Sequence, residues 1–92
     1  MITSFRHKGL EAFFRTGNQA GIRPVHANRL RQMLTALNAA ETPNDLMRPS
    51  WRLHRLTGDR AGYLAMTVQA NWRLVFRFSD GNIELLDYLD YH

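Results

Sequence analysis

The strongest constraint on the fold of this chain is an alternation of apolar and polar residues near its C-terminal end. From Asn71 to Phe78 every second residue is large and apolar, namely Trp72, Leu74, Phe76 and Phe78. A period of two is typical of a β-strand with one buried face. Asp80-Gly81 follows, a pair that favours a type I′ turn, and Ile83 to about Tyr91 supplies a partner strand. The sequence therefore predicts a β-hairpin with one apolar face.

Further strands are predicted upstream of this hairpin. After Ser50, Trp51 and Leu53 alternate with polar residues, and Tyr63 to Val68 has the composition of a strand. Gly58-Asp59 and Gly62 indicate turns between these segments. Because the connections are too short to hold a crossover helix, we expect the strands to pair as antiparallel hairpins.

The first half of the chain shows helical periodicity instead. Lys8 to Arg15 carries apolar residues at helical spacing, and Gly17 behind it fits a helix C-terminus. Val25 to Ala40 carries an i, i+3, i+4, i+7 stripe of Leu30, Met33, Leu34 and Leu37, and a loop with two prolines, Thr42 to Pro49, follows. We predict an α+β fold, with two N-terminal helices packed on one face of a small antiparallel β-sheet in a single domain over residues 1–92.

The same alternation predicts what the other face of the sheet presents. If the apolar set of the hairpin points inward, then Arg73, Val75 and Arg77 point outward. Likewise, Leu53 points inward and its neighbours point outward. The face would then display a cluster of cations and one imidazole: Arg52, His54, Arg73 and Arg77. Such a surface suits an RNA backbone, whereas the simpler interpretation is a solvated face with cross-strand pairs of arginine and acid.

Charge along the chain favours the first interpretation. The basic residues are eleven arginines and one lysine. Arginine binds phosphate bidentately and stacks on bases, which lysine cannot do. Residues 48–78 hold six arginines and a single acid, Asp59, whereas residues 79–92 hold four acids and no lysine or arginine. A concentrated basic segment indicates an anionic partner, of which nucleic acid is the commonest.

Several other classes of protein are disfavoured. The chain has no cysteine, which excludes a disulfide framework and a thiolate zinc site. Its first ten residues lack the apolar core of a signal peptide, and no apolar run approaches the roughly 20 residues of a membrane helix. His7, His26, His54 and His92 are scattered without the spacing of metal ligands. We therefore expect a cytoplasmic protein that uses no metal and no other cofactor.

The chain ends with an acid, a phenol and an imidazole in a row: Asp90, Tyr91 and His92. Histidine titrates near neutrality and is the commonest general acid or base. Tyrosine can stack on a base or hydrogen-bond to a phosphate. Together with the arginine-rich face, this end is a candidate for acid–base chemistry on RNA, although a terminal histidine is more commonly just an exposed chain end.

Taken together, these motifs resemble a known family. The whole chain is similar to the HigB toxins of the RelE/ParE superfamily, which have a RelE-like fold. The matching motifs, in order, are Ile2-Thr3-Ser4-Phe5, Lys8-Gly9-Leu10, Arg52-Leu53-His54, Gly58-Asp59-Arg60, Asn71-Trp72-Arg73 and Asp90-Tyr91-His92.

The resemblance implies a concrete activity. It implies a metal-independent endoribonuclease, or mRNA interferase, that cleaves messenger RNA in the ribosomal A site as the toxin of a type II toxin–antitoxin pair. The partner would be a HigA-like helix-turn-helix antitoxin. The functional positions of the family match five residues here: His54, Arg73, Asp90, Tyr91 and His92.

This chain differs from many members of the family at one substrate-binding position. Many relatives have lysine where this chain has Thr57. Thr57 could still donate a hydrogen bond, and Arg55 or Arg60 could supply the charge. We expect four residues to bind substrate: Arg52, Thr57, Arg60 and Arg77.

The chemistry of RNA cleavage suggests a role for each candidate site residue, but it does not tell the general acid from the general base. Arg73 would stabilise the phosphate and Tyr91 would stack on or position a base. His54 and His92 are candidates for proton transfer, with Asp90 as a base or as the group that orients an imidazole. Two other functions stay open: a ParE-like inhibitor of DNA gyrase, and a non-catalytic RNA-binding module. The gyrase inhibitor would not need His54 or the terminal Tyr91-His92, and the RNA-binding module would keep the arginine face but tolerate loss of His92.

Overall fold

The computed structural model describes residues 1–91 and confirms the predicted α+β class. Its two α-helices are α1 (Lys8–Thr16) and α2 (Ala27–Ala39). Four antiparallel strands follow in the spatial order of the sequence: β1 (His54–Arg55), β2 (Leu64–Gln69), β3 (Trp72–Ser79) and β4 (Asn82–Asp90). Single 3₁₀ turns occupy the connections Pro24–His26, Pro43–Leu46, Pro49–Trp51 and Gly58–Arg60. Within residues 1–91, no helix is long and apolar enough to cross a membrane.

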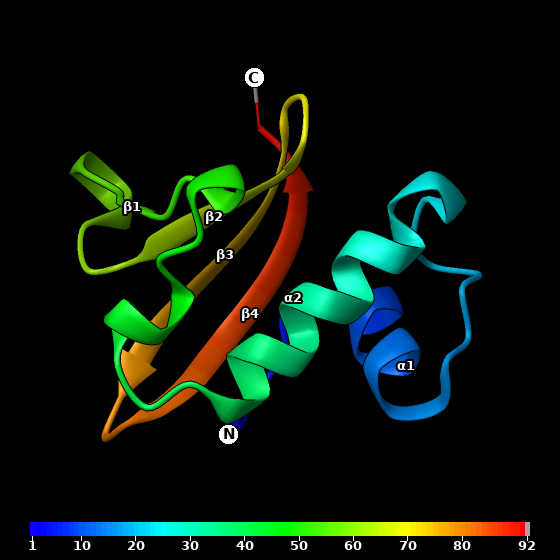
Figure 1. Ribbon diagram of the computed structural model, residues 1–92, viewed down its shortest axis with the longest axis horizontal. Coiled ribbons are helices and arrows are strands. Elements are labelled where there is room, and N and C mark those ends of the chain that lie inside the picture. The colour runs from blue at the N-terminus through cyan, green and yellow to red at the C-terminus, as the bar shows by residue number, and fades with distance from the viewer. Residues whose placement is uncertain (92) are drawn as a thin grey trace.

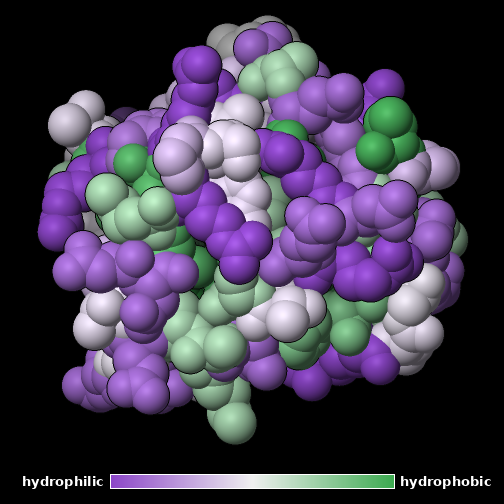
Figure 2. Space-filling model, in the orientation of Figure 1, coloured by the Kyte–Doolittle hydropathy of each residue, from purple (hydrophilic) through white to green (hydrophobic). Residues whose placement is uncertain are grey.

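One hydrophobic core joins the helices to the sheet. The predicted stripe of α2 is buried, as are Leu74 and Phe76 of β3, and these residues belong to one cluster. In Figure 1, α1 and α2 lie beside β4, and α1 is the farther of the two from the strands. Figure 2 shows the outside of this arrangement, where hydrophilic residues predominate and hydrophobic ones are scattered in small patches. Of the alternating apolar residues of β3, Leu74 and Phe76 are buried, and Trp72 and Phe78 are partly buried against the same core.

The turn between β3 and β4 has the predicted type I′ geometry. Asp80 and Gly81 both have positive φ angles, 54° and 80°, and Ser79 pairs with Asn82 across the turn. This register is interrupted farther along β4, where Leu85 has a φ of 56° and the pairing shifts by one residue. A β-bulge of this kind turns the following residues of the strand to the opposite face.

The N-terminal segment extends the sheet beyond β4. Ile2 and Phe5 form parallel bridges with Ile83 and Leu86 of β4. The backbone N–H of Leu86 donates to the carbonyl of Ser4, and that of Arg6 donates to the carbonyl of Leu86, at 3.2 and 2.8 Å. Residues 1–6 therefore cover the edge of β4, which protects it from pairing with another chain.

The prediction that Trp51 begins a strand is wrong. Pro49–Trp51 forms a 3₁₀ turn, in which Trp51 is 2% exposed and the guanidinium of Arg48 lies 4.5 Å from its ring centroid. Arg52 then adopts a left-handed φ of 49°, and pairing starts only at His54. Burial of the large indole outweighs the local preference for an extended backbone.

Two glycines bring α1 into contact with the loop that leads to α2. A Cβ added to Gly9 would lie 2.6 Å from the carbonyl oxygen of Gly21, and a Cβ on Gly21 would collide with the Cα of Gly9. Contacts this close leave no room for a methyl group. Gly9 is required for this packing, although helix propensity by itself would favour alanine.

We predict that Gly9→Ala destabilises the protein. Helix propensity alone would make this change stabilising by about 1 kcal/mol. The clash with backbone atoms of Gly21 should instead lower the free energy of unfolding by about 1–3 kcal/mol. Urea unfolding of Gly9→Ala and Gly21→Ala checks this, and a midpoint equal to or above that of the wild type for either variant would contradict the close approach.

Candidate functional site

The face of the sheet opposite the core, here called the open face, collects side chains from all four strands. The register aligns His54 with Ala65, Ala65 with Val75, and Val75 with Asp87. Paired residues on antiparallel strands share a face. One row therefore crosses the sheet from β1 to β4, and the next row joins Thr67, Arg73 and Leu89.

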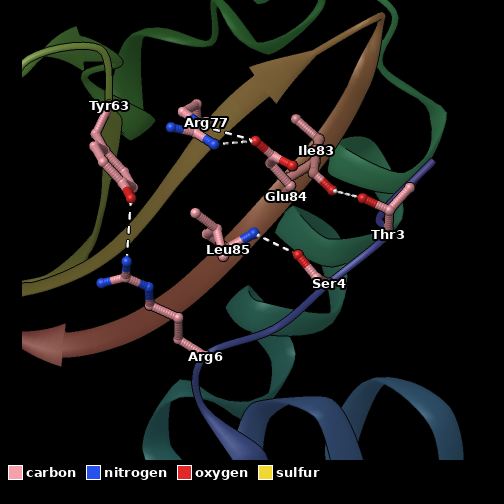
Figure 3. Close-up of polar contacts among 8 residues, drawn as sticks. All are labelled: Thr3, Ser4, Arg6, Tyr63, Arg77, Ile83, Glu84 and Leu85. Carbon is pink, nitrogen blue, oxygen red and sulfur yellow. Dashed lines mark hydrogen bonds and ion pairs between the residues drawn. The ribbon is translucent and has the colours of Figure 1, made fainter.

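A small pocket opens on this face and was not predicted from the sequence. Its volume is about 240 Å³, and its lining consists of two arginines, two aspartates, one tyrosine and two aliphatic residues: Arg6, Arg60, Asp59, Asp87, Tyr63, Val75 and Leu85. Figure 3 shows how one wall is built, with Arg6 reaching from the N-terminal segment to Tyr63 and Leu85 lying to one side of this pair. The guanidinium of Arg6 donates to the Tyr63 hydroxyl at 3.2 Å.

Val75 faces outward, as alternation predicts, but it is not exposed to solvent. It is 3% exposed, and its neighbour Ala65 in the same row is 1% exposed. Val75 lines the pocket together with Leu85. The open face therefore has a buried apolar floor at its centre, which is typical of a binding site rather than of a plain solvated face.

Arg77 departs from the expectation of an unpaired cation. Its Nε donates to a carboxylate oxygen of Glu84 at 2.8 Å, as Figure 3 shows. The hydrogen bond and charge of Glu84 raise the pKa of Arg77. The low acid content of residues 48–78 did not exclude this pair because β4 supplies the acid. The open face is thus a mosaic of both charges and not uniformly basic.

His54 is exposed on β1 and has a defined hydrogen bond. Its Nδ1 lies 2.8 Å from the carbonyl oxygen of Arg52. A carbonyl can only accept, so Nδ1 carries a proton, and in the neutral form of the ring the lone pair is therefore at Nε2. Such a ring can take up a proton from a substrate through Nε2. Arg52 itself is exposed and precedes the strand, and its backbone carbonyl is the group that contacts His54.

Arg73 lies on the open face as predicted, but it also supports the fold. Its Nη1 donates to the carbonyl oxygens of Ala70 and of Trp72, the latter at 3.2 Å. Ala70 has a left-handed φ of 50° in the turn between β2 and β3. The side chain is half-buried. Its guanidinium is thereby held in a fixed orientation above this turn.

The C-terminal residues fall on two sides of the sheet. Asp90 pairs with Trp72, whose side chain packs against the core, so alternation places Asp90 on the helix side. Tyr91 follows on the open side, where the guanidinium of Arg60 lies 5.7 Å from its ring centroid. The N–H of Tyr91 donates to the carbonyl of Asn71 at 2.8 Å, which ties the chain end to β3. His92 lies outside the described residues.

The structure thus brings some of the predicted site residues together and separates others. Arg60 and Tyr91 touch beside the pocket, and Arg73 lies one row away. His54 and Arg73 share the open face on strands β1 and β3, two strands and one row apart, which corresponds to about 12 Å at the backbone given the usual strand spacing and rise per residue. Thr57 is exposed before the 3₁₀ turn that carries Arg60. Among residues 1–91, no group of three or more histidines and acids is arranged to hold a metal ion.

Sequence reasoning missed several residues of the pocket. Tyr63 could have been found, because alternation from Leu64 places it on the open face. Asp87 could not, because an unbroken hairpin register would pair Val75 with residue 86, and only the bulge at Leu85 makes Asp87 the partner. Arg6 arrives through the parallel edge contact, which no local pattern indicates.

We predict that Arg73→Ala lowers stability. The variant loses two hydrogen bonds to carbonyls of the turn between β2 and β3, and the free energy of unfolding should fall by about 1 kcal/mol or more. Urea unfolding measures this, with Arg77→Ala as the control. Arg77 makes an exposed ion pair with Glu84 and a contact at 5.8 Å with the centroid of the Tyr63 ring, and loss of these surface contacts should cost less. Equal losses in the two variants would argue against a structural role for Arg73.

Comparison with known proteins identifies the family that this chain resembles, independently of the geometry. A family model described as "RelE-like toxin of type II toxin-antitoxin system HigB" matches residues 3–92. The chain is 42% identical over 92 residues to "Endoribonuclease HigB" of Proteus vulgaris, with all of both chains covered. It is 33% identical over 94 residues to "Toxin HigB-1" of Vibrio cholerae serotype O1, covering 100% of this chain and 98% of that protein.

Proposed function

This chain belongs to the HigB-like family of RelE-like toxins of type II toxin–antitoxin systems, and from that premise we propose that it is a metal-independent endoribonuclease that cleaves messenger RNA in the ribosomal A site. The observation that supports this most is the open face, which carries His54, Arg73 and the Arg60–Tyr91 contact on one surface. A nuclease needs these same three kinds of group, for proton transfer, for phosphate and for a base.

RNA carries its own nucleophile, which defines what the protein has to supply. The 2′-hydroxyl attacks the neighbouring phosphorus, a base takes its proton, and an acid protonates the departing 5′-oxygen. His54 is suited to be the base, because its Nδ1 is committed to the Arg52 carbonyl and Nε2 has the lone pair. His92 is our candidate for the acid. Each such group contributes about 10²- to 10⁴-fold in rate.

Positioned cations would stabilise the charge that builds on the phosphate. Arg73 is suited to this because its Nη1 contacts fix the guanidinium on the open face without neutralising it. Arg60, next to Tyr91, can reach a second phosphate while Tyr91 stacks on a base. Asp90 faces the side of the sheet opposite to Tyr91. We therefore propose that Asp90 orients the chain end and does not itself abstract the proton.

The remaining predicted substrate-binding residues have outer positions. Arg52 and Thr57 are exposed near β1 and would contact the strand of RNA beyond the scissile phosphate. Arg77 would have to exchange Glu84 for a phosphate. The partner we propose is a HigA-like helix-turn-helix antitoxin, as expected for a family of toxin–antitoxin pairs.

We predict that cleavage requires the ribosome and resists EDTA. The open face is small and mixed in charge, so it should grip a strand too weakly to position it alone. Two enzyme samples, one untreated and one treated with EDTA, are each incubated with free mRNA and with programmed 70S ribosomes, which tests both points. Equal cleavage of free and ribosome-bound mRNA, or loss of activity after chelation, would contradict the proposal. Inhibition of DNA gyrase without RNA cleavage would favour the ParE-like alternative.

The C-terminal end gives a second prediction. Deletion of Tyr91-His92 should abolish toxicity, and a six-residue extension after His92 should weaken it more than the same extension before Met1. A displacement of about 1 Å can cost about a hundredfold in rate at a catalytic group. Tyr91→Phe should keep most activity, since it retains the ring that contacts Arg60. Growth arrest at matched expression, with thermal melts as the control for folding, measures these effects. A fully toxic deletion variant would exclude the terminal residues from catalysis.

A further inference from the structure

We propose that a groove on the outer side of α2 binds an acidic helical segment of the antitoxin. The groove has a volume of about 650 Å³, and its lining includes Arg31, Gln32, Ala36 and Ala39 of α2 and Arg48 of the loop that follows. The site deepens the proposed function and rests on it, because the occupant is the antitoxin named there. None of the residues assigned to RNA cleavage above lines the groove.

The groove lies away from the open face of the sheet. The buried stripe of α2 faces the core that the helices share with the sheet. The residues that line the groove occupy the other side of the same helix, where Gln32, Thr35 and Ala39 are exposed. From Asn28 to Ala39 the lined face is roughly 16 Å long at 1.5 Å per residue, or about three helical turns. A partner seated here would contact the helix layer and not the catalytic face.

Two arginines at the groove are held in place without an acidic partner. The guanidinium of Arg31 lies 5.4 Å from the centroid of the Phe13 ring, and its Nη1 donates to the side-chain oxygen of Asn28 at 2.9 Å. The guanidinium of Arg48 lies 4.5 Å from the centroid of the Trp51 ring. Within residues 1–91 neither arginine forms an ion pair. A side chain that is already oriented loses less entropy on binding, so both arginines are suited to carboxylates of a partner.

Acids at one end of the groove favour a protein partner over RNA. A second hollow shares three lining residues with the groove, Arg48 among them, and is also lined by Glu41 and Asp45. Asp45 accepts hydrogen bonds from the backbone N–H groups of Glu41 and Thr42 at 2.9 and 3.2 Å, and these bonds lower its pKa and keep it ionised. Such carboxylates would repel a phosphate backbone, which carries negative charge along its whole length. A protein segment can instead place acids opposite the arginines and a base opposite Glu41.

The shape of the groove suits a helix. Ala36 and Ala39 are small, so a partner can approach α2 closely, and helices that pack against each other have axes about 8–10 Å apart. A helix of two or three turns, with acids spaced to meet Arg31 and Arg48, would fill the groove as amphipathic helices fill grooves of other proteins. The antitoxin is the partner that membership in a toxin–antitoxin family supplies.

An NMR titration of the full-length toxin tests where the partner binds. The toxin, with ¹³C-labelled alanine methyl groups, is titrated with its cognate antitoxin and, in a separate sample, with a short RNA duplex. Ala36 and Ala39 report on the groove, whereas the exposed Ala61 and Ala70 lie in turns beside the open face. We expect the antitoxin to shift the first pair of signals more than the second. Equal shifts of the two pairs, no shift of either, or a response of Ala36 and Ala39 to the duplex as large as that to the antitoxin would overturn the inference.

Charge reversal tests the two arginines. Arg31→Glu and Arg48→Glu should each weaken antitoxin binding at least about tenfold, because a carboxylate would then face the acids of the partner. Arg15→Glu is the matched control, since Arg15 is also an exposed helical arginine and its guanidinium lies 5.8 Å from the centroid of the Phe5 ring. We expect this control to bind like the wild type. Normal binding by either groove variant, or equal weakening by the control, would contradict the assignment.

A steric variant covers the case in which charge reversal disturbs folding, which thermal melts reveal. Ala39 is exposed at the end of α2, so Ala39→Trp should fill the groove without altering the core. We expect it to weaken antitoxin binding with no change of charge. A folded Ala39→Trp variant that binds the antitoxin as tightly as the wild type would contradict a helix seated in the groove.

Cleavage of ribosome-bound mRNA distinguishes failure of the groove from failure of the proposed function. Arg31→Glu should cleave as the wild type does, because the groove lies away from the open face, but it should need more antitoxin for neutralisation. Loss of cleavage in a folded Arg31→Glu variant would make the groove part of the RNA-cleaving machinery and overturn the inference. Antitoxin binding at the groove by a protein that cuts no RNA would reject the nuclease and leave the groove assignment intact. Cleavage by a wild type whose antitoxin binds elsewhere would overturn the groove alone.

Discussion

The pairing of β3 with β4, and the bulge within it, is the constraint on which the rest of the structure depends. The type I′ turn at Asp80-Gly81 sets the register from Ser79 back to Arg77. At Leu85 the backbone takes a left-handed φ of 56°, and its N–H donates to the Ser4 hydroxyl at 2.8 Å (Figure 3). The N-terminal segment therefore holds the bulge in place. The bulge in turn puts Asp87, instead of residue 86, in the row with Val75.

This arrangement explains why the open face has a pocket and mixed charge. The bulge places Leu85 in the pocket lining, and the parallel edge segment brings Arg6 within reach of Tyr63. The acids of β4 come to lie among the arginines of β3 and of the 3₁₀ turn Gly58–Arg60. One arginine, Arg77, is paired as a result, whereas Arg73 is directed toward backbone carbonyls and Arg60 toward Tyr91. The site is thus composed of cations with distinct surroundings and not of one uniform basic patch.

A buried polar network supports the end of the sheet that carries these groups. His26 is 2% exposed, and its two ring nitrogens lie 2.7 Å from the Tyr88 hydroxyl and 2.9 Å from the Gln69 side-chain oxygen. Burial raises the pKa of Tyr88, which stays a neutral donor. The network joins the start of α2 to β2 and β4 just before Arg73 and Tyr91. Buried polar groups that are fully hydrogen-bonded fix one arrangement of the elements around them.

The sequence by itself determined the elements and the two faces of the sheet. Alternation from Asn71 to Phe78 and the Asp80-Gly81 turn gave the hairpin, and the stripe of α2 gave the helix, because these patterns arise from the local geometry of the backbone. The motifs at His54, Arg73 and Tyr91 also indicated the family and the face on which a site could lie. How far those residues act as assigned remains a prediction.

Only the tertiary structure decided how the side chains combine. Burial of Trp51 in a 3₁₀ turn delayed the start of the predicted first strand to His54. Glu84 paired with Arg77 although the acid and the base lie on different strands. Asp90 and Tyr91, adjacent in sequence, face opposite sides of the sheet. The pocket needed a bulge and an edge segment that are stabilised by contacts between residues about 80 positions apart. Such contacts depend on which segments meet in space, and a periodic pattern within one segment carries no information about that meeting.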